Sequence, residues 1–173
     1  MHPVNTVTLT EHIPATEFKQ AKSEVNVAGK ASGIIVSGHV LEAAVQVGDD
    51  RYLIFTTDDV IYEEYLTVTL IDLHDGVLES LQLGNQYSSG FFEKLSTNHK
   101  SVQFHFTGDA VWTIEVFESP RLRLPFLSDP RKVKRSSGLK AYMTIQGRRR
   151  QLKAEWRKLT ENKPEFVKQP NPG

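Results

Sequence analysis

The sequence predicts a mainly β protein, an antiparallel β-sandwich or partly closed barrel built from hairpins, with a short N-terminal helix and a basic C-terminal helix. Two observations lead to this prediction. Between residues 33 and 126, apolar and polar residues alternate with the two-residue period of a strand, and short polar turns separate the alternating runs. The turns near residues 49, 75 and 109 are unevenly spaced, which disfavours a propeller or a solenoid.

Three segments are expected along the chain. They are an N-terminal segment (1–32), an antiparallel β core (33–126) and a basic C-terminal extension (127–173), which packs on the core or is mobile, and is disordered after 164. In the first segment, residues Thr16 to Glu24 predict a short helix. Thr16 is a suitable N-cap residue, and Phe18 and Ala21 lie three positions apart, on one helical face.

Three hairpins are expected in the core, because in each case two alternating apolar rows fall on the same face. Their turns lie at residues 48–51, at the Asp75-Gly76 pair, which favours a tight type I′ turn, and at residues 108–110. The expected cross-strand pairs are Val47 with Tyr52 and Val45 with Ile54 in the first hairpin, Leu70 with Leu81 and Val68 with Leu83 in the second, and Phe106 with Trp112 and Phe104 with Ile114 in the third.

The C-terminal extension predicts three further elements. Residues Leu127 to Gly138 are rich in Ser, Pro, Lys and Arg and predict a loop, whereas Tyr142 to Ile145 predict one more strand. Residues Arg148 to Thr160 predict a helix that ends before Pro164. Its apolar positions, at i, i+4 and i+7, are Leu152, Trp156 and Leu159.

Composition places the chain among ordinary globular proteins. It has 173 residues, of which 39% are hydrophobic and 24% charged, so one domain with a substantial core is expected. It has no cysteine, which excludes disulfides and thiolate metal sites and fits a reducing compartment. Neither a signal peptide nor an apolar run long enough to span a bilayer is visible, so we expect a cytoplasmic location.

The charges are distributed unevenly, although their sum is zero. Residues 1–118 contain 6 basic and 17 acidic side chains, and residues 119–173 contain 15 basic and 4 acidic ones. A separation of this kind points to charged partners rather than to a particular fold. The acidic segment and the basic segment are therefore the two candidate binding regions.

The acidic candidates lie in loops and turns of the β core, where we expect them to form a docking surface for a basic protein. The cluster at 58–64 also contains enough carboxylates for a hard cation such as Ca²⁺, but it lacks the spacing of a calcium loop, so no metal site is predicted. A third interpretation is a short helical turn with solvated acids. The expected partner-binding residues are Asp49, Asp50, Asp58, Asp59, Glu63, Glu64, Asp72 and Asp75.

The basic extension suggests contact with nucleic acid, because clustered Lys and Arg contact phosphates and an aromatic ring stacks on bases. The expected contact residues are Arg148, Arg149, Arg150, Lys153, Trp156 and Arg157. A basic amphipathic helix also suits an anionic membrane surface. In the structural alternative, the apolar face packs on the β core and the basic residues neutralise its acidic loops.

Neither a nucleotide-binding loop nor a nucleophile motif occurs, so no cofactor and no enzymatic activity are expected. The leading hypothesis is a non-enzymatic protein-binding β domain whose acidic loops capture a basic partner, in the manner of toxin-neutralising immunity proteins. The first alternative is a nucleic-acid-binding protein that acts through the basic extension. The second is a small hydrolase or isomerase with a cavity in the β domain, using carboxylates and a histidine such as His105.

Overall fold

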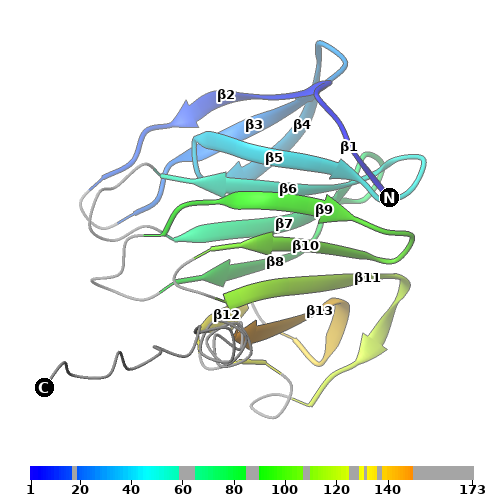
Figure 1. Cartoon of the computed structure of the whole chain (residues 1–173). Coiled ribbons are helices and arrows are strands. Elements are labelled where there is room, and N and C mark those ends of the chain that lie inside the picture. Colours follow the sequence, from blue (N-terminus) through cyan, green and yellow to red (C-terminus); the bar gives the residue numbers. More distant parts are fainter. Residues whose placement is uncertain are drawn as a thin grey trace, which may run out of the picture.

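The computed structural model describes residues 1–16, 19–58, 65–84, 90–106, 110–124, 129–130, 132–135 and 138–149. Within these residues the protein is mainly β, and none of them is helical. The strands form three antiparallel sheets, and no sheet closes into a barrel (Figure 1). Among the described residues, no helix is both long and apolar enough to cross a membrane.

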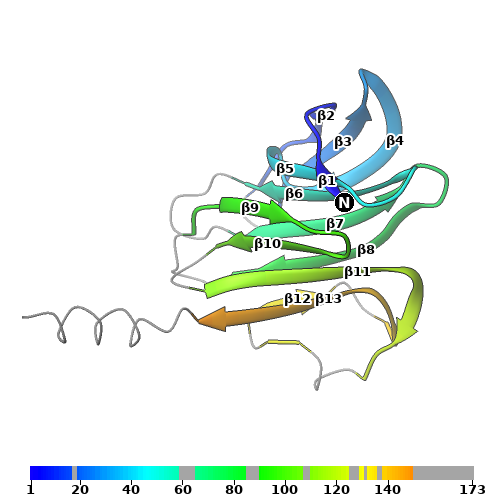
Figure 2. The same cartoon turned by 45° about the vertical axis from the view of Figure 1, so that its right-hand side comes forward.

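A six-stranded sheet forms the centre of the molecule, and two smaller sheets pack on it (Figures 1 and 2). The central sheet has the order β1 (His2–Pro3), β5 (Val40–Gln46), β6 (Arg51–Thr57), β7 (Leu66–Asp72), β8 (Gly76–Leu83) and β12 (Val133–Arg135). The four-stranded sheet has the order β13 (Lys140–Arg149), β11 (Ala110–Leu122), β10 (Ser101–His105) and β9 (Glu93–Thr97). The three-stranded sheet consists of β2 (Val7–Ile13), β3 (Lys22–Val27) and β4 (Lys30–Ser37).

The middle strands of the central sheet, β6 and β7, are buried on both faces, and each face belongs to a different hydrophobic core. Leu53 and Phe55 of β6 pack with apolar residues of the four-stranded sheet in the larger core. Tyr52 and Ile54, which alternate with them, pack with residues of the three-stranded sheet in the smaller core. All seven residues of β7 are buried. The protein is therefore a three-layer antiparallel β structure, which confirms the mainly β, antiparallel fold expected from the sequence, and no sheet of the described residues closes into a barrel.

The first hairpin is present, but its predicted register is wrong by one residue. Val45 lies opposite Leu53, and Gln46 lies opposite Tyr52. The prediction aligned Val47 with Tyr52 on the assumption that only one face of β6 is apolar. Because β6 is buried on both faces, its side chains do not alternate in polarity, and the apolar pattern does not fix the register.

The second and third hairpins have the predicted faces, with registers two residues away from the expected ones. Val68 pairs with Leu81 in the second, and Phe104 pairs with Trp112 in the third. A shift of two residues keeps every side chain on the same face of the sheet. The remaining apolar pairs are Leu66 with Leu83 and Val102 with Ile114.

The N-terminal helix expected over Thr16–Glu24 is not found among the described residues. Lys22, Ser23 and Glu24 belong to β3, and Thr16 forms an isolated antiparallel bridge with Lys19. Phe18 lies outside the described residues. Ala21 and Ser23 are completely buried, so this segment contributes to the core as extended chain rather than as a helix.

The C-terminal extension contributes two strands to the described structure. The strand expected over Tyr142–Ile145 is confirmed as part of β13. The loop expected over Leu127–Gly138 is wrong for β12, which pairs with β8. Arg148 and Arg149 continue β13 instead of starting a helix, and the rest of the expected helix lies outside the described residues. The expected boundary after residue 32 falls inside β4.

A buried ion network joins the central and four-stranded sheets. The Arg135 guanidinium on β12 forms an ion pair with Glu79 on β8 and binds Asp129 through Nε and Nη2, at 2.9 and 3.0 Å. The Oε2 atom of Glu79 accepts backbone N–H groups of Tyr142 and Met143 in β13, at 2.7 and 2.9 Å. Burial disfavours the charge of Arg135, but its hydrogen bonds and the charges of both carboxylates outweigh burial and raise its pKa.

Candidate functional site

Two hairpin turns meet at one end of the central sheet. The β5–β6 turn carries Asp49 and Asp50, and the β7–β8 turn carries His74 and Asp75. Because β6 and β7 are antiparallel neighbours, the start of β6 and the end of β7 lie together, and both turns are at the same end of the sheet. The backbone N–H of Leu73 donates to the Asp50 carbonyl at 2.9 Å, so the turns are hydrogen-bonded to each other.

Asp72 determines the conformation of the second turn. Its Oδ1 atom accepts the backbone N–H groups of His74 and Asp75, at 3.0 and 3.3 Å, as in an Asx turn. Gly76 follows with a φ of 82°, which a residue with a Cβ adopts at a cost. The predicted two-residue turn at Asp75-Gly76 is therefore wrong: the loop has three residues, 73–75, and the left-handed Gly76 follows it as the first residue of β8.

Arg51 connects the turn to the four-stranded sheet. Its Nε atom donates to Asp72 Oδ2 at 2.9 Å, and its Nη1 atom donates to the Glu118 carbonyl at 2.6 Å. The guanidinium carbon also lies 5.9 Å from the centre of the Tyr142 ring. The Arg51 hydrogen bond and the backbone N–H of His74 lower the pKa of Asp72, although burial opposes them.

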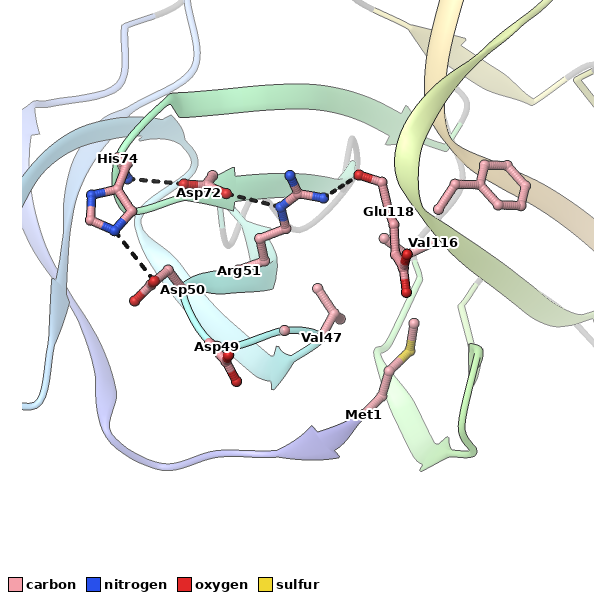
Figure 3. Close-up of a pocket in the computed structure, with 11 residues that line it drawn as sticks. Met1, Val47, Asp49, Asp50, Arg51, Asp72, His74, Val116 and Glu118 are labelled. Atoms are coloured by element: carbon pink, nitrogen blue, oxygen red, sulfur yellow. Dashed lines mark hydrogen bonds and ion pairs between the residues drawn. The ribbon is translucent and has the colours of Figure 1, made fainter.

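These residues surround an open pocket of about 400 Å³ (Figure 3). The lining consists of residues from the two turns, the Arg51–Asp72 pair, β11 and the N-terminus. Four of these residues, which we call the apolar side of the pocket, are Met1, Val47, Val116 and Phe117. We use the name acidic turn face for the exposed carboxylate residues at and beside this pocket, which are Asp49, Asp50, Asp75 and Glu118.

The charges of the pocket favour a cationic ligand. Four carboxylates and one guanidinium line it, and the guanidinium is already bound to one of those carboxylates. The Nε2 atom of His74 lies 3.3 Å from Asp50 Oδ2, where the two side chains are 79% and 50% exposed. A carboxyl with a lowered pKa, such as Asp72, is a weak base at neutral pH, so its chemistry here is electrostatic.

The predicted acidic residues fall at two ends of the molecule. Asp49, Asp50, Asp72 and Asp75 come together at the turn end, although Asp72 is buried and paired with Arg51. Asp58 follows the opposite end of β6. There its Oδ2 atom accepts a hydrogen bond from Gln20 at 2.6 Å, and its Oδ1 atom lies 4.0 Å from His39 Nδ1. The other three predicted acids, Asp59, Glu63 and Glu64, lie outside the described residues.

The predicted nucleic-acid contacts fall mostly outside the described residues, namely Arg150, Lys153, Trp156 and Arg157. Arg148 is exposed in β13, opposite Val111, and the backbone of Arg149 pairs with Ala110. Binding of nucleic acid through this segment therefore stays a prediction. Within the described part of the chain, no group of three or more His, Asp or Glu side chains is arranged to hold a metal ion.

Sequence reasoning did not identify Arg51, Glu118 or the apolar side of the pocket. Arg51 had a local signal, because it follows the first turn directly and a correct β6–β7 register aligns it with Asp72. No local sequence pattern indicated that Glu118 and Phe117 would line the pocket. They reach the pocket because β11 departs from its regular register with β13 between Val116 and Arg121. His105, named for the enzyme hypothesis, lies in β10 and does not line this pocket.

Comparisons with protein-family models, with curated proteins and with solved structures found no match to this chain.

Proposed function

We propose that this protein is a binding module that captures a basic protein on the acidic turn face. The supporting observation is the group of exposed carboxylates around a pocket. The two turns and β11 are joined there by hydrogen bonds. Arg51 makes two of these ties, to Asp72 and to the Glu118 carbonyl. A face that is already ordered loses little conformational entropy when a partner binds.

Electrostatics suit a partner rich in lysine or arginine. Asp49, Asp75 and Glu118 are exposed, and the Arg51 guanidinium in the pocket lining is engaged by Asp72. Complementary charge on a partner increases the association rate and excludes acidic competitors. The apolar side of the pocket adds a surface for the methylene stem of a long cationic side chain, because such stems pack on apolar groups while the charge stays solvated.

Charge reversal with a matched control tests the proposal. In the test variant, Asp49→Lys and Asp75→Lys reverse two exposed carboxylates of the acidic turn face. In the control, Glu93→Lys and Glu115→Lys reverse two exposed carboxylates of the four-stranded sheet and change the net charge by the same amount. The full chain and both variants are titrated with a fluorescent lysine-rich decapeptide, and anisotropy is recorded at low and at physiological salt.

The expected result is at least about tenfold weaker binding in the test variant and little change in the control, because two lost charge contacts together contribute more than about 1.4 kcal/mol. Equal weakening in both variants would indicate attraction by overall charge and would contradict a specific face. The finer form of the proposal is a toxin-neutralising protein whose basic partner is a nuclease. Inhibition of a basic nuclease by the control variant, but not by the test variant, would support this form.

A further inference from the structure

Six strands form the edges of the three sheets, and five of them carry features that discourage pairing with another chain. β1 has two residues, one of which is Pro3. β12 has three residues, two of them basic. β9 begins with Glu93 and Lys94, and Lys94 has a φ of 55°. Short length, prolines, charges and distorted backbone are common means of protecting a sheet edge.

The two longer edges, β4 and β13, also carry features that discourage pairing. β4 begins at Lys30, has Gly33 at a φ of 74° and shifts register against β3. In β13, the backbone N–H groups of Tyr142 and Met143 are bound by the Glu79 carboxylate from the central sheet. From Met143 to Arg149, β13 keeps a regular register with β11, but this stretch ends in Arg148 and Arg149, and charged residues on an edge discourage pairing.

β2 differs from the other five edges. Its seven residues contain no proline, lysine, arginine or glycine. Its register with β3 is regular from Val7 to Glu11 and shifts only after Glu11, and among the described residues it has no strand partner on its other side. A regular strand directs half of its backbone N–H and C=O groups away from its partner, so β2 presents an open row of these groups.

We propose that this edge pairs with β2 of a second copy of the chain, antiparallel and centred on Leu9. In this register Leu9 lies opposite Leu9 of the partner, and Thr8 lies opposite the partner's Thr10. The two three-stranded sheets become one continuous six-stranded sheet. Because both copies use the same edge, two-fold pairing leaves no unpaired β2 edge, and the assembly is a closed dimer.

The side chains of β2 favour a second copy as the occupant. Leu9 is partly buried against the smaller core, so two apposed Leu9 side chains extend that core across the dimer. Thr8 and Thr10 are exposed, and paired threonines on neighbouring strands are mutually stabilising. The charged residue of the strand, Glu11, lies opposite Val7 of the partner, away from the partner's Glu11.

The first test is the mass of the full chain in solution, measured by light scattering and sedimentation over a range of concentrations. The expected mass is twice that of one chain, with dissociation on dilution. A single-chain mass at every concentration would overturn the proposal. Hydrogen exchange provides a second readout that needs no variant: the outward amides of β2 should be protected at high concentration and exchange on dilution. Equal exchange at both concentrations would also overturn it.

A charge-swap series tests the register. Thr8→Lys with Thr10→Lys places lysines opposite one another, and the dimer dissociation constant should rise about tenfold or more. Thr8→Glu with Thr10→Lys changes the same positions but places a carboxylate opposite an ammonium group at both pairs, so dimerisation should return to near the original level. A double-lysine variant that dimerises as well as the unchanged chain, or a swapped variant that stays monomeric, would overturn self-pairing in this register. Neither position belongs to the acidic turn face.

Discussion

Two arginine–carboxylate pairs differ in burial and in what they connect. The Arg135 and Glu79 side chains are 4% and 7% exposed, and they join β8 and β12 of the central sheet to β13. The Arg51 and Asp72 side chains are 27% and 11% exposed, and they border a pocket. Both pairs link the central sheet to the four-stranded sheet, the first through the backbone of β13 and the second through the Glu118 carbonyl of β11, but the second also orders the acidic turn face. The same chemistry therefore serves stability at one place and a candidate binding site at the other.

The largest effect is expected from Arg135→Met. The substitution leaves the buried Glu79 carboxylate without its guanidinium, whereas Asp129 keeps its ion pair with Arg123, and an unpaired buried charge typically costs about 3–5 kcal/mol. Urea unfolding followed by tryptophan fluorescence measures this loss. Lys134→Met, at the exposed neighbouring position, is the control and should change the free energy of unfolding by less than about 0.5 kcal/mol. Similar values for both variants would show that the network contributes little.

A smaller loss is expected from Glu79→Gln. The amide oxygen still accepts the N–H groups of Tyr142 and Met143, but the charge opposite Arg135 disappears. Asp129 continues to neutralise the guanidinium, so we expect a loss of about 2 kcal/mol in the same urea measurement. Glu79→Leu should cost more, because it also leaves both backbone donors without an acceptor. Equal losses for the Gln and Leu variants would contradict the role of Oε2.

Arg51→Met should destabilise the protein less than either Glu79 variant, by about 1 kcal/mol, because the pair is partly solvated and Asp72 keeps two backbone N–H donors. The ties that order the acidic turn face should nevertheless weaken. Hydrogen exchange at Leu73 and His74 measures this local effect, and β8 provides the reference. A free-energy loss as large as that of Arg135→Met would contradict the smaller contribution of the Arg51–Asp72 pair to stability.

The smallest expected effect is on the acid dependence of stability. The folded-state pKa of Asp72 lies below its ordinary value of 3.8, so its stabilising contribution is complete above that pH and is lost as the pH falls through the lower folded-state pKa. Arg51→Met removes the largest cause of the lowered pKa. The stability difference between the unchanged chain and this variant should therefore shrink as the pH falls below 3.8. A difference that is constant from neutral pH into acid would contradict this assignment.

The sequence was sufficient to predict antiparallel strands and the correct faces of two hairpins, because Leu81, Leu83 and the aromatic rows alternate clearly with polar residues. It was insufficient where strands are buried on both sides. Leu53 and Ile54 are neighbours and both are fully buried, so no alternation indicated which of them faces which core. The three-layer architecture follows from this double burial. Alternation of apolar and polar residues indicates strands that are buried on one face only, so it does not reveal strands that are buried on both.

Four predicted acids of the site lie together because β5, β6, β7 and β8 are antiparallel neighbours, which places both turns at one end of the sheet. The role of Asp72 was not predictable from its type, since its partner Arg51 is distant in sequence and its pairing depends on the β6–β7 register. The positions of Glu118 and Phe117 at the pocket were even less predictable, because they lie where the register of β11 with β13 is irregular. Long-range contacts of this kind are set by tertiary packing rather than by local sequence.

The double burial of β6 and β7 has a consequence for the order in which the native state opens. The amide protons of these strands lie beneath a layer on either side, so we expect them to exchange more slowly than those of the outer strands. The three-stranded layer contributes fewer residues to its core than the four-stranded layer contributes to the larger one. The outer hairpins around β2 and β3 should therefore form the first cooperative unit to open, and the shared sheet the last.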